Sequence, residues 1–110
     1  MSFVRDDSVR VLVSTAPSEE VAARIARALV ERRLVACVNL VPRVRSVYRW
    51  QGEVHDDAET LMLMKTTPAR APEVAEALRE LHPYECPELI ELGVEGGLAA
   101  YLAWVAGATT

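Results

Sequence analysis

Two stretches of this chain do not alternate between apolar and polar residues, which limits how they can be built into a sheet. "LVACVNLV" (34–41) and "LMLM" (61–64) are apolar at odd and even positions alike. Successive side chains of a strand point to opposite faces, and a strand with one solvated face alternates between apolar and polar residues. The two stretches therefore predict a sheet that is covered on both faces.

The pattern around these stretches predicts an α+β chain of one domain, residues 1–110. Residues 8–15, 34–50, 54–67 and 88–94 have the composition of strands, and residues 17–33, 68–81 and 97–108 have helical periodicity. The order βαββαβ, followed by a short helix, is that of a ferredoxin-like fold with an antiparallel sheet.

Local signals place several boundaries. Ser18 is the expected N-cap of the first helix, and Pro72 fits the second helix only in its first turn. Pro42 cannot donate a ladder hydrogen bond, so we expect a bulge or an edge there. "QGE" (51–53) predicts the turn of a long hairpin.

The same fold predicts that the chain assembles with copies of itself. Right-handed crossovers place both main helices on one face of the sheet. The other face would then expose a large apolar surface, which soluble monomers avoid. We therefore expect a homo-oligomer that buries this face.

Composition argues against several classes of partner. The net charge of -4 and an aromatic content of 5% disfavour a nucleic-acid binder. No apolar run approaches the roughly 20 residues of a membrane span, and "MSFVRDDSVR" lacks the pattern of a signal peptide. We expect a cytoplasmic protein whose two cysteines, Cys37 and Cys86, are free thiols.

No catalytic motif is present, so we expect a protein that is not an enzyme and has no catalytic residues. The chain contains no GxSxG, P-loop, HExxH, GxGxxG or EF-hand pattern. His82 follows the second helix, where it serves either as a structural cap or as a metal ligand, with Glu85 and Cys86 nearby. Cys37 lies in an apolar run, and such a cysteine usually packs as a small hydrophobe.

Lys65, the only lysine, ends the "LMLM" strand. It either extends along the apolar surface toward solvent, or it reaches a cavity between subunits and pairs with a carboxylate such as Glu88. Tyr48, Trp50, Tyr84 and Trp104 have apolar rings with a polar group, which suits interfaces as well as pockets.

Several stretches together resemble the CutA family of divalent-cation tolerance proteins. They are "LVERRLVACVNLVPRVRSVYRWQGEV", "LMLMKTT", "LHPYECPELIEL" and "YLAWV", and they cover nearly the whole chain in order. The resemblance implies a ferredoxin-like protomer in a homotrimer similar to the PII signalling proteins, with sheets inward and helices outward.

The resemblance also implies a role in tolerance of copper or another divalent cation. The ligands proposed in the family are a cysteine just before the "TAP" motif and histidines before the "PY" motif. Here Ser14 occupies the first position, and His82 alone, preceded by Leu81, occupies the second. The metal-ligand candidates are therefore His82, with Cys37 and Ser14 as secondary candidates.

The polar residues that line the subunit clefts of the family match positions of this sequence: Tyr48, Trp50, Lys65, His82, Tyr84 and Glu88. A small anionic or polar ligand would lie there. Three hypotheses follow, namely a copper-tolerance protein with His82 as ligand, a PII-like module that senses a small molecule, and a purely structural trimer.

Overall fold

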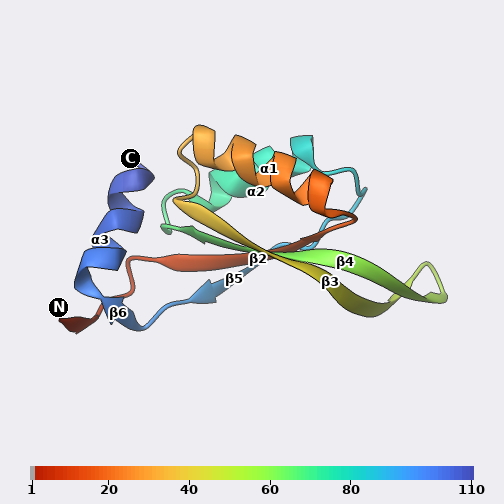
Figure 1. Ribbon diagram of the computed structural model, residues 1–110, viewed down its shortest axis with the longest axis horizontal. Helices are drawn as coiled ribbons and strands as arrows, with labels where there is room; N and C mark the ends of the chain where they lie inside the picture. Colours follow the sequence, from red (N-terminus) through yellow and green to blue (C-terminus); the bar gives the residue numbers. More distant parts are fainter. Residues whose placement is uncertain (1) are drawn as a thin grey trace.

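The computed structural model describes residues 2–110 and has the predicted α+β architecture (Figure 1). The strands are β1 (Phe3–Arg5), β2 (Arg10–Ala16), β3 (Cys37–Trp50), β4 (Glu53–Thr66), β5 (Ile90–Gly93) and β6 (Gly96–Leu98). The helices are α1 (Glu19–Glu31), α2 (Ala71–Leu81) and α3 (Ala99–Ala108).

The main sheet confirms the ferredoxin-like prediction. Its strand order is β3-β4-β2-β5, and all of its neighbouring strands are antiparallel. Helices α1 and α2 lie together on one face of this sheet (Figure 1). The other face carries no helix over most of its area, as the two crossovers require.

The central strand β4 explains the doubly apolar sequence pattern. Met62 and Met64 are fully buried beneath the helices, in one cluster with Leu12, Ile25 and Leu29. Leu61 and Leu63 point to the helix-free face, because neighbouring residues of a strand alternate between faces. On the same face Ile90 and Leu92 of β5 remain 52% and 48% exposed. We call the apolar residues of this surface the open face; they are Val11, Val13, Val41, Leu61, Leu63, Ile90 and Leu92.

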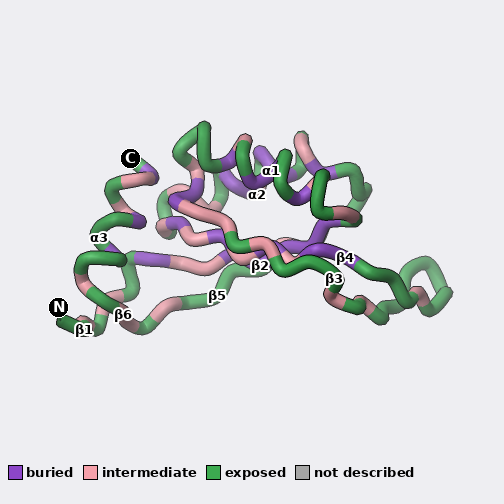
Figure 2. Tube along the Cα trace, in the orientation of Figure 1, coloured by how far each residue is buried: buried purple, intermediate pink, exposed green. Residues whose placement is uncertain are grey.

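The β3–β4 hairpin extends well beyond the other strands. β2 pairs with β4 only from Thr60 to Thr66, so residues 53–59 pair with β3 alone. The two-residue turn at Gln51 and Gly52 has φ of 51° and 82°, as the tight hairpin prediction requires. The far part of the hairpin is mostly exposed (Figure 2).

The predicted irregularity at Pro42 is confirmed. The register shifts between Val41 and Val44, where β3 gains one residue relative to β4, and Arg43 has φ of 60°. The capping predictions are confirmed as well. The Ser18 hydroxyl accepts a hydrogen bond from the Val21 N–H, and Pro72 lies in the first turn of α2.

A second, smaller sheet was not predicted. β1 pairs with β6, and α3 packs beside them around a separate core of Val9, Ala36, Leu102 and Val105. The sequence prediction also began the terminal helix at residue 97, whereas Gly97 and Leu98 belong to β6. Within residues 2–110, no helix combines the length and the apolar character needed to cross a membrane.

We predict that Gly96→Ala destabilises the chain by disrupting the β1–β6 pair. A Cβ at Gly96 would lie 2.4 Å from the Val4 carbonyl oxygen, so the backbone must shift. Such overpacking costs about 1–3 kcal/mol of unfolding free energy. Urea denaturation measures the loss. Gly93→Ala is the control, because a Cβ there has no atom within 4 Å, and equal stability of the two variants would contradict the prediction.

Candidate functional site

A cleft forms where β2 ends and the β3–β4 hairpin continues past it. Its volume is about 620 Å³. The loop between α2 and β5 covers one side, and the hairpin forms the other. The lining residues are Thr15, Arg45, Ser46, Val47, Tyr48, Trp50, Glu59, Tyr84, Glu85, Cys86 and Glu88. Four of the predicted pocket residues, Tyr48, Trp50, Tyr84 and Glu88, therefore lie together.

Three aromatic rings enter the cleft from two elements. Tyr48 and Trp50 share one face of β3, since they are two residues apart in a strand, and Tyr84 comes from the α2–β5 loop. The exposed fractions of the three residues are 40%, 42% and 37%, so each remains partly open to solvent. The Tyr48 ring also stacks on His55, its cross-strand partner, with centroids 5.2 Å apart.

The tyrosine hydroxyls donate to carboxylates of β4. Tyr84 Oη donates to Glu59 Oε2 at 2.7 Å, and Tyr48 Oη donates to Asp57 Oδ2 at 2.8 Å. Burial and then the hydrogen bond to Glu59 raise the pKa of Tyr84 well above its usual value. The hydrogen bond to Asp57 raises the pKa of Tyr48. Both phenols therefore keep their protons to a higher pH than a free tyrosine does.

Negative charge predominates in the cleft. Glu59 is 8% exposed, and Glu85 and Glu88 lie nearer the solvent. Arg45 also lines the cleft, but its guanidinium forms a bidentate pair with Asp56, at 2.8 and 2.6 Å. None of the ion pairs within residues 2–110 includes Glu59, Glu85 or Glu88.

His82 is a buried structural cap in this structure. Its Nδ1 accepts a hydrogen bond from the Tyr84 N–H at 3.1 Å, so Nε2 carries the proton and donates to the Thr15 carbonyl at 2.7 Å. Neither nitrogen then offers a free lone pair to a metal. The imidazole ring instead joins the end of β2 to the loop that carries Tyr84. The centroids of the His82 and Tyr84 rings lie 4.7 Å apart.

The three metal-ligand candidates do not form one site. Ser14 is fully buried on the helix side of β2, where its hydroxyl donates to the Glu88 carbonyl at 2.6 Å. Cys37 begins β3, rather than lying mid-strand, and is half-buried on the opposite face of the sheet. Within residues 2–110, no three His, Cys, Asp or Glu side chains are grouped to hold a metal. The donor set therefore does not fit a metal centre within one chain.

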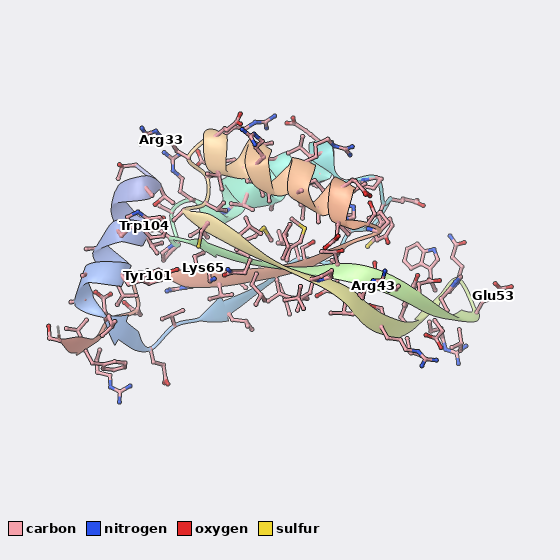
Figure 3. All side chains as sticks on the ribbon, viewed as in Figure 1. Arg33, Arg43, Glu53, Lys65, Tyr101 and Trp104 are labelled. Carbon is pink, nitrogen blue, oxygen red and sulfur yellow. The ribbon has the colours of Figure 1, made fainter. Side chains whose placement is uncertain are left out.

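Lys65 lies away from the cleft. Its ammonium donates a hydrogen bond to the Asn39 side-chain carbonyl. Lys65 is also the cross-strand neighbour of Cys37 in β3. The Cys37 Sγ lies 3.6 Å from Tyr101 Oη. Figure 3 shows Lys65 and Tyr101 toward the α3 end of the sheet, opposite the hairpin tip at Glu53. Within one chain Lys65 does not pair with Glu88; that pairing was one of two alternatives and was expected between subunits.

Sequence reasoning missed several cleft residues. Glu59 lies in a polar segment just ahead of an apolar run, and in the sequence such a glutamate is expected to be exposed. Cys86 was considered as a metal ligand and not as a residue of the cleft. Arg45 and Ser46 lie in the hairpin just after the Pro42 bulge. The acidic segment ahead of "LMLM" was the available signal, because it pairs across the hairpin with the segment that carries Tyr48 and Trp50.

A family model described as "CutA1 divalent ion tolerance protein" matches residues 10–108. The chain is similar to the "Divalent-cation tolerance protein CutA" of Thermus thermophilus, at 53% identity over 95 residues, which are 86% of this chain and 92% of that protein. It is also similar to "Protein CutA" of Mus musculus, at 49% identity over 98 residues. These cover 89% of this chain and 55% of the mouse protein, so the chain spans about half of the mouse sequence.

Solved structures agree with the fold. The divalent cation tolerance protein from Thermus thermophilus superimposes with a TM-score of 0.90 at 50% identity, covering 93% of this chain and 99% of that one. CutA from Synechococcus elongatus superimposes with a TM-score of 0.94 at 33% identity, covering 99% and 96%.

We predict that the folded chain resists ionisation of its tyrosines. All three have a raised pKa; the hydrogen bond with the Cys37 sulfur, followed by burial, raises that of Tyr101 to about 12. Above pH about 10 the unfolded chain loses phenolic protons that the folded chain retains. The free energy of unfolding is therefore unaffected by these groups below that pH, and it falls as the pH rises through their folded-state pKa values.

Ultraviolet absorbance of phenolate measures this directly in folded and urea-denatured protein. Denaturation at increasing pH then measures the loss of stability, and Tyr84→Phe reduces its pH dependence. Coincident titration curves for the folded and denatured chain would refute the prediction.

Proposed function

The chain belongs to the CutA1 divalent ion tolerance protein family, and from that premise we propose that it acts as a homotrimer that binds a small molecule in its cleft. The observation that carries this proposal is the cleft itself, in which aromatic rings and carboxylates from two elements meet in about 620 Å³. Concave sites in which aromatic side chains and polar groups converge are typical of ligand-binding sites. In this reading the protein is a PII-like module that serves divalent-cation tolerance from the cytoplasm.

The open face supports assembly. Its exposed Ile90, Leu92 and Val41 form a contiguous apolar surface with the leucines of β4, and such surfaces mark protein interfaces. Thr15 points to this face of β2 and also lines the cleft. A second copy on the open face would therefore lie at the rim of the cleft and complete its outer side.

We propose a binding role rather than a catalytic one. General-base catalysis near neutral pH requires a group whose pKa lies near that range. Tyr48 and Tyr84 have pKa values raised above that of a free phenol, and their hydroxyls donate to carboxylates. The cleft is thus suited to holding a ligand.

Direct copper binding through His82 is the second candidate, because the family is described as one of divalent ion tolerance and copper forms such an ion. It requires His82 to release the Thr15 carbonyl or the Tyr84 N–H. A buried polar group left without a partner costs about 1–3 kcal/mol, so copper must compensate for that loss. Cys86 is exposed on the same loop and would be the nearest soft donor.

We predict that the purified chain sediments as a trimer and that Ile90→Glu dissociates it at micromolar concentration, because a buried carboxylate without a partner is unfavourable. Analytical ultracentrifugation measures the mass. Val30→Glu on α1 is the matched control, since Val30 is 41% exposed but lies away from the open face. A wild-type monomer, or equal dissociation of both variants, would count against the trimer.

We predict that a thermal-shift screen of metabolites and metal salts identifies at least one metabolite that raises the melting temperature. A ligand at about 100 times its Kd stabilises the folded state by about 2.7 kcal/mol. Trp50→Ala should abolish the shift. For copper, we expect equal calorimetric affinity in the wild type and His82→Ala, with a lower melting temperature for the variant.

Two results would change this proposal. A screen without any stabilising metabolite would remove the ligand-binding function. A loss of copper affinity of about tenfold or more in His82→Ala, about 1.4 kcal/mol, would establish the second candidate.

A further inference from the structure

We infer that the ligand of the cleft is an organic cation of the ammonium class. This rests on the proposed function, that the cleft binds a small molecule, and it assigns the charge of that molecule. The family resemblance in the sequence had implied a small anionic or polar ligand instead. Three features of the described residues support a cation.

The first feature is a buried carboxylate without a counter-charge. Glu59 is 8% exposed and lines the cleft, and its one side-chain partner is the neutral Tyr84 hydroxyl. Arg43 lines a neighbouring hollow with Glu59, but no ion pair joins them in residues 2–110. A buried charge is normally paired, so a ligand cation would supply what Glu59 lacks.

The second feature is the set of aromatic faces. Tyr48, Trp50 and Tyr84 surround the same space as Glu59, and each ring is more than one-third exposed. The negative face of an aromatic ring attracts organic cations, and groups of such rings bind quaternary ammonium ions. The raised pKa values of Tyr48 and Tyr84 agree with the negative field that Asp57 and Glu59 produce there.

The third feature is the lack of a free cationic group. Arg45 is the one basic residue among the lining residues, and Asp56 already binds its guanidinium. An anionic ligand would therefore meet Glu59, Glu85 and Glu88 without compensation. A bare divalent ion fits less well than an ammonium ion, because these residues do not group three metal ligands and the aromatic rings offer none.

The experiment uses Trp50 as its probe in a Trp104→Phe background. The chain has two tryptophans, and Trp104 lies on α3, away from the cleft (Figure 3). Three probes of nearly equal shape are titrated into the oligomer as purified: choline, its neutral isostere dimethylbutanol, and the anion dimethylbutyrate. We expect choline to change the Trp50 fluorescence saturably, and to bind about tenfold or more tightly than the other two.

Glu59→Gln tests the carboxylate directly, because glutamine keeps an acceptor for the Tyr84 hydroxyl and removes only the charge. We expect choline affinity to fall about tenfold while that of dimethylbutanol stays unchanged. Glu53→Gln is the matched control, since it removes the same charge at the tip of the hairpin outside the cleft (Figure 3).

Each contrary result has a separate meaning. If dimethylbutanol or dimethylbutyrate binds as tightly as choline, the cation assignment is wrong although the cleft binds ligands. If Glu59→Gln leaves choline affinity unchanged, or Glu53→Gln lowers it equally, Glu59 is not the recognising group and the inference fails. If no probe alters the fluorescence, the inference is overturned, and the metabolite screen judges the proposed function independently.

Discussion

The fold depends on β4, which the chain encloses at both edges and on the face beneath the helices. Its two edges hydrogen-bond to β2 and β3, and Met62 and Met64 are fully buried beneath the helices. The opposite side presents Leu61 and Leu63, which no element of the same chain covers fully. A strand that is apolar on both faces is favoured when both faces are covered. The same strand therefore supplies the core beneath the helices and the apolar residues of the open face.

The cleft exists because two paired strands differ in length. β4 continues past the end of β2, so the hairpin overhangs a region that the loop after α2 fills only in part. His82 and Ser14 then fix that loop to β2 through buried hydrogen bonds. Because these bonds do not involve a ligand, Tyr84 and the Glu88 backbone are already in position. A preformed site loses little conformational freedom when it binds.

Local signals in the sequence predicted the main elements, because periodicity, caps and turn residues act over a few positions. The β1–β6 pair gave no such signal, since each strand has three residues and the partners lie at opposite ends of the chain. Glu59 was missed because its burial depends on Tyr84, 25 residues away. Lys65 was matched to the cleft through the family resemblance, but its position along β4 separates it from the cleft. The cleft aromatics were found through the family resemblance, and the structure brings them together.

The extra residue in β3 near Pro42 has a consequence for how this surface can change. Before the bulge the odd-numbered side chains of β3 share a face with Leu61 and Leu63, and after it the even-numbered ones do. Deleting this one residue would restore the uninterrupted alternation and keep Tyr48 and Trp50 on their present face, because Val44 would still lie opposite Glu59. If the present sequence paired with β4 without the bulge, Arg45, Val47 and Arg49 would take that face instead. The bulge thus decides whether the distal strand presents an aromatic or a basic surface on the side of the cleft.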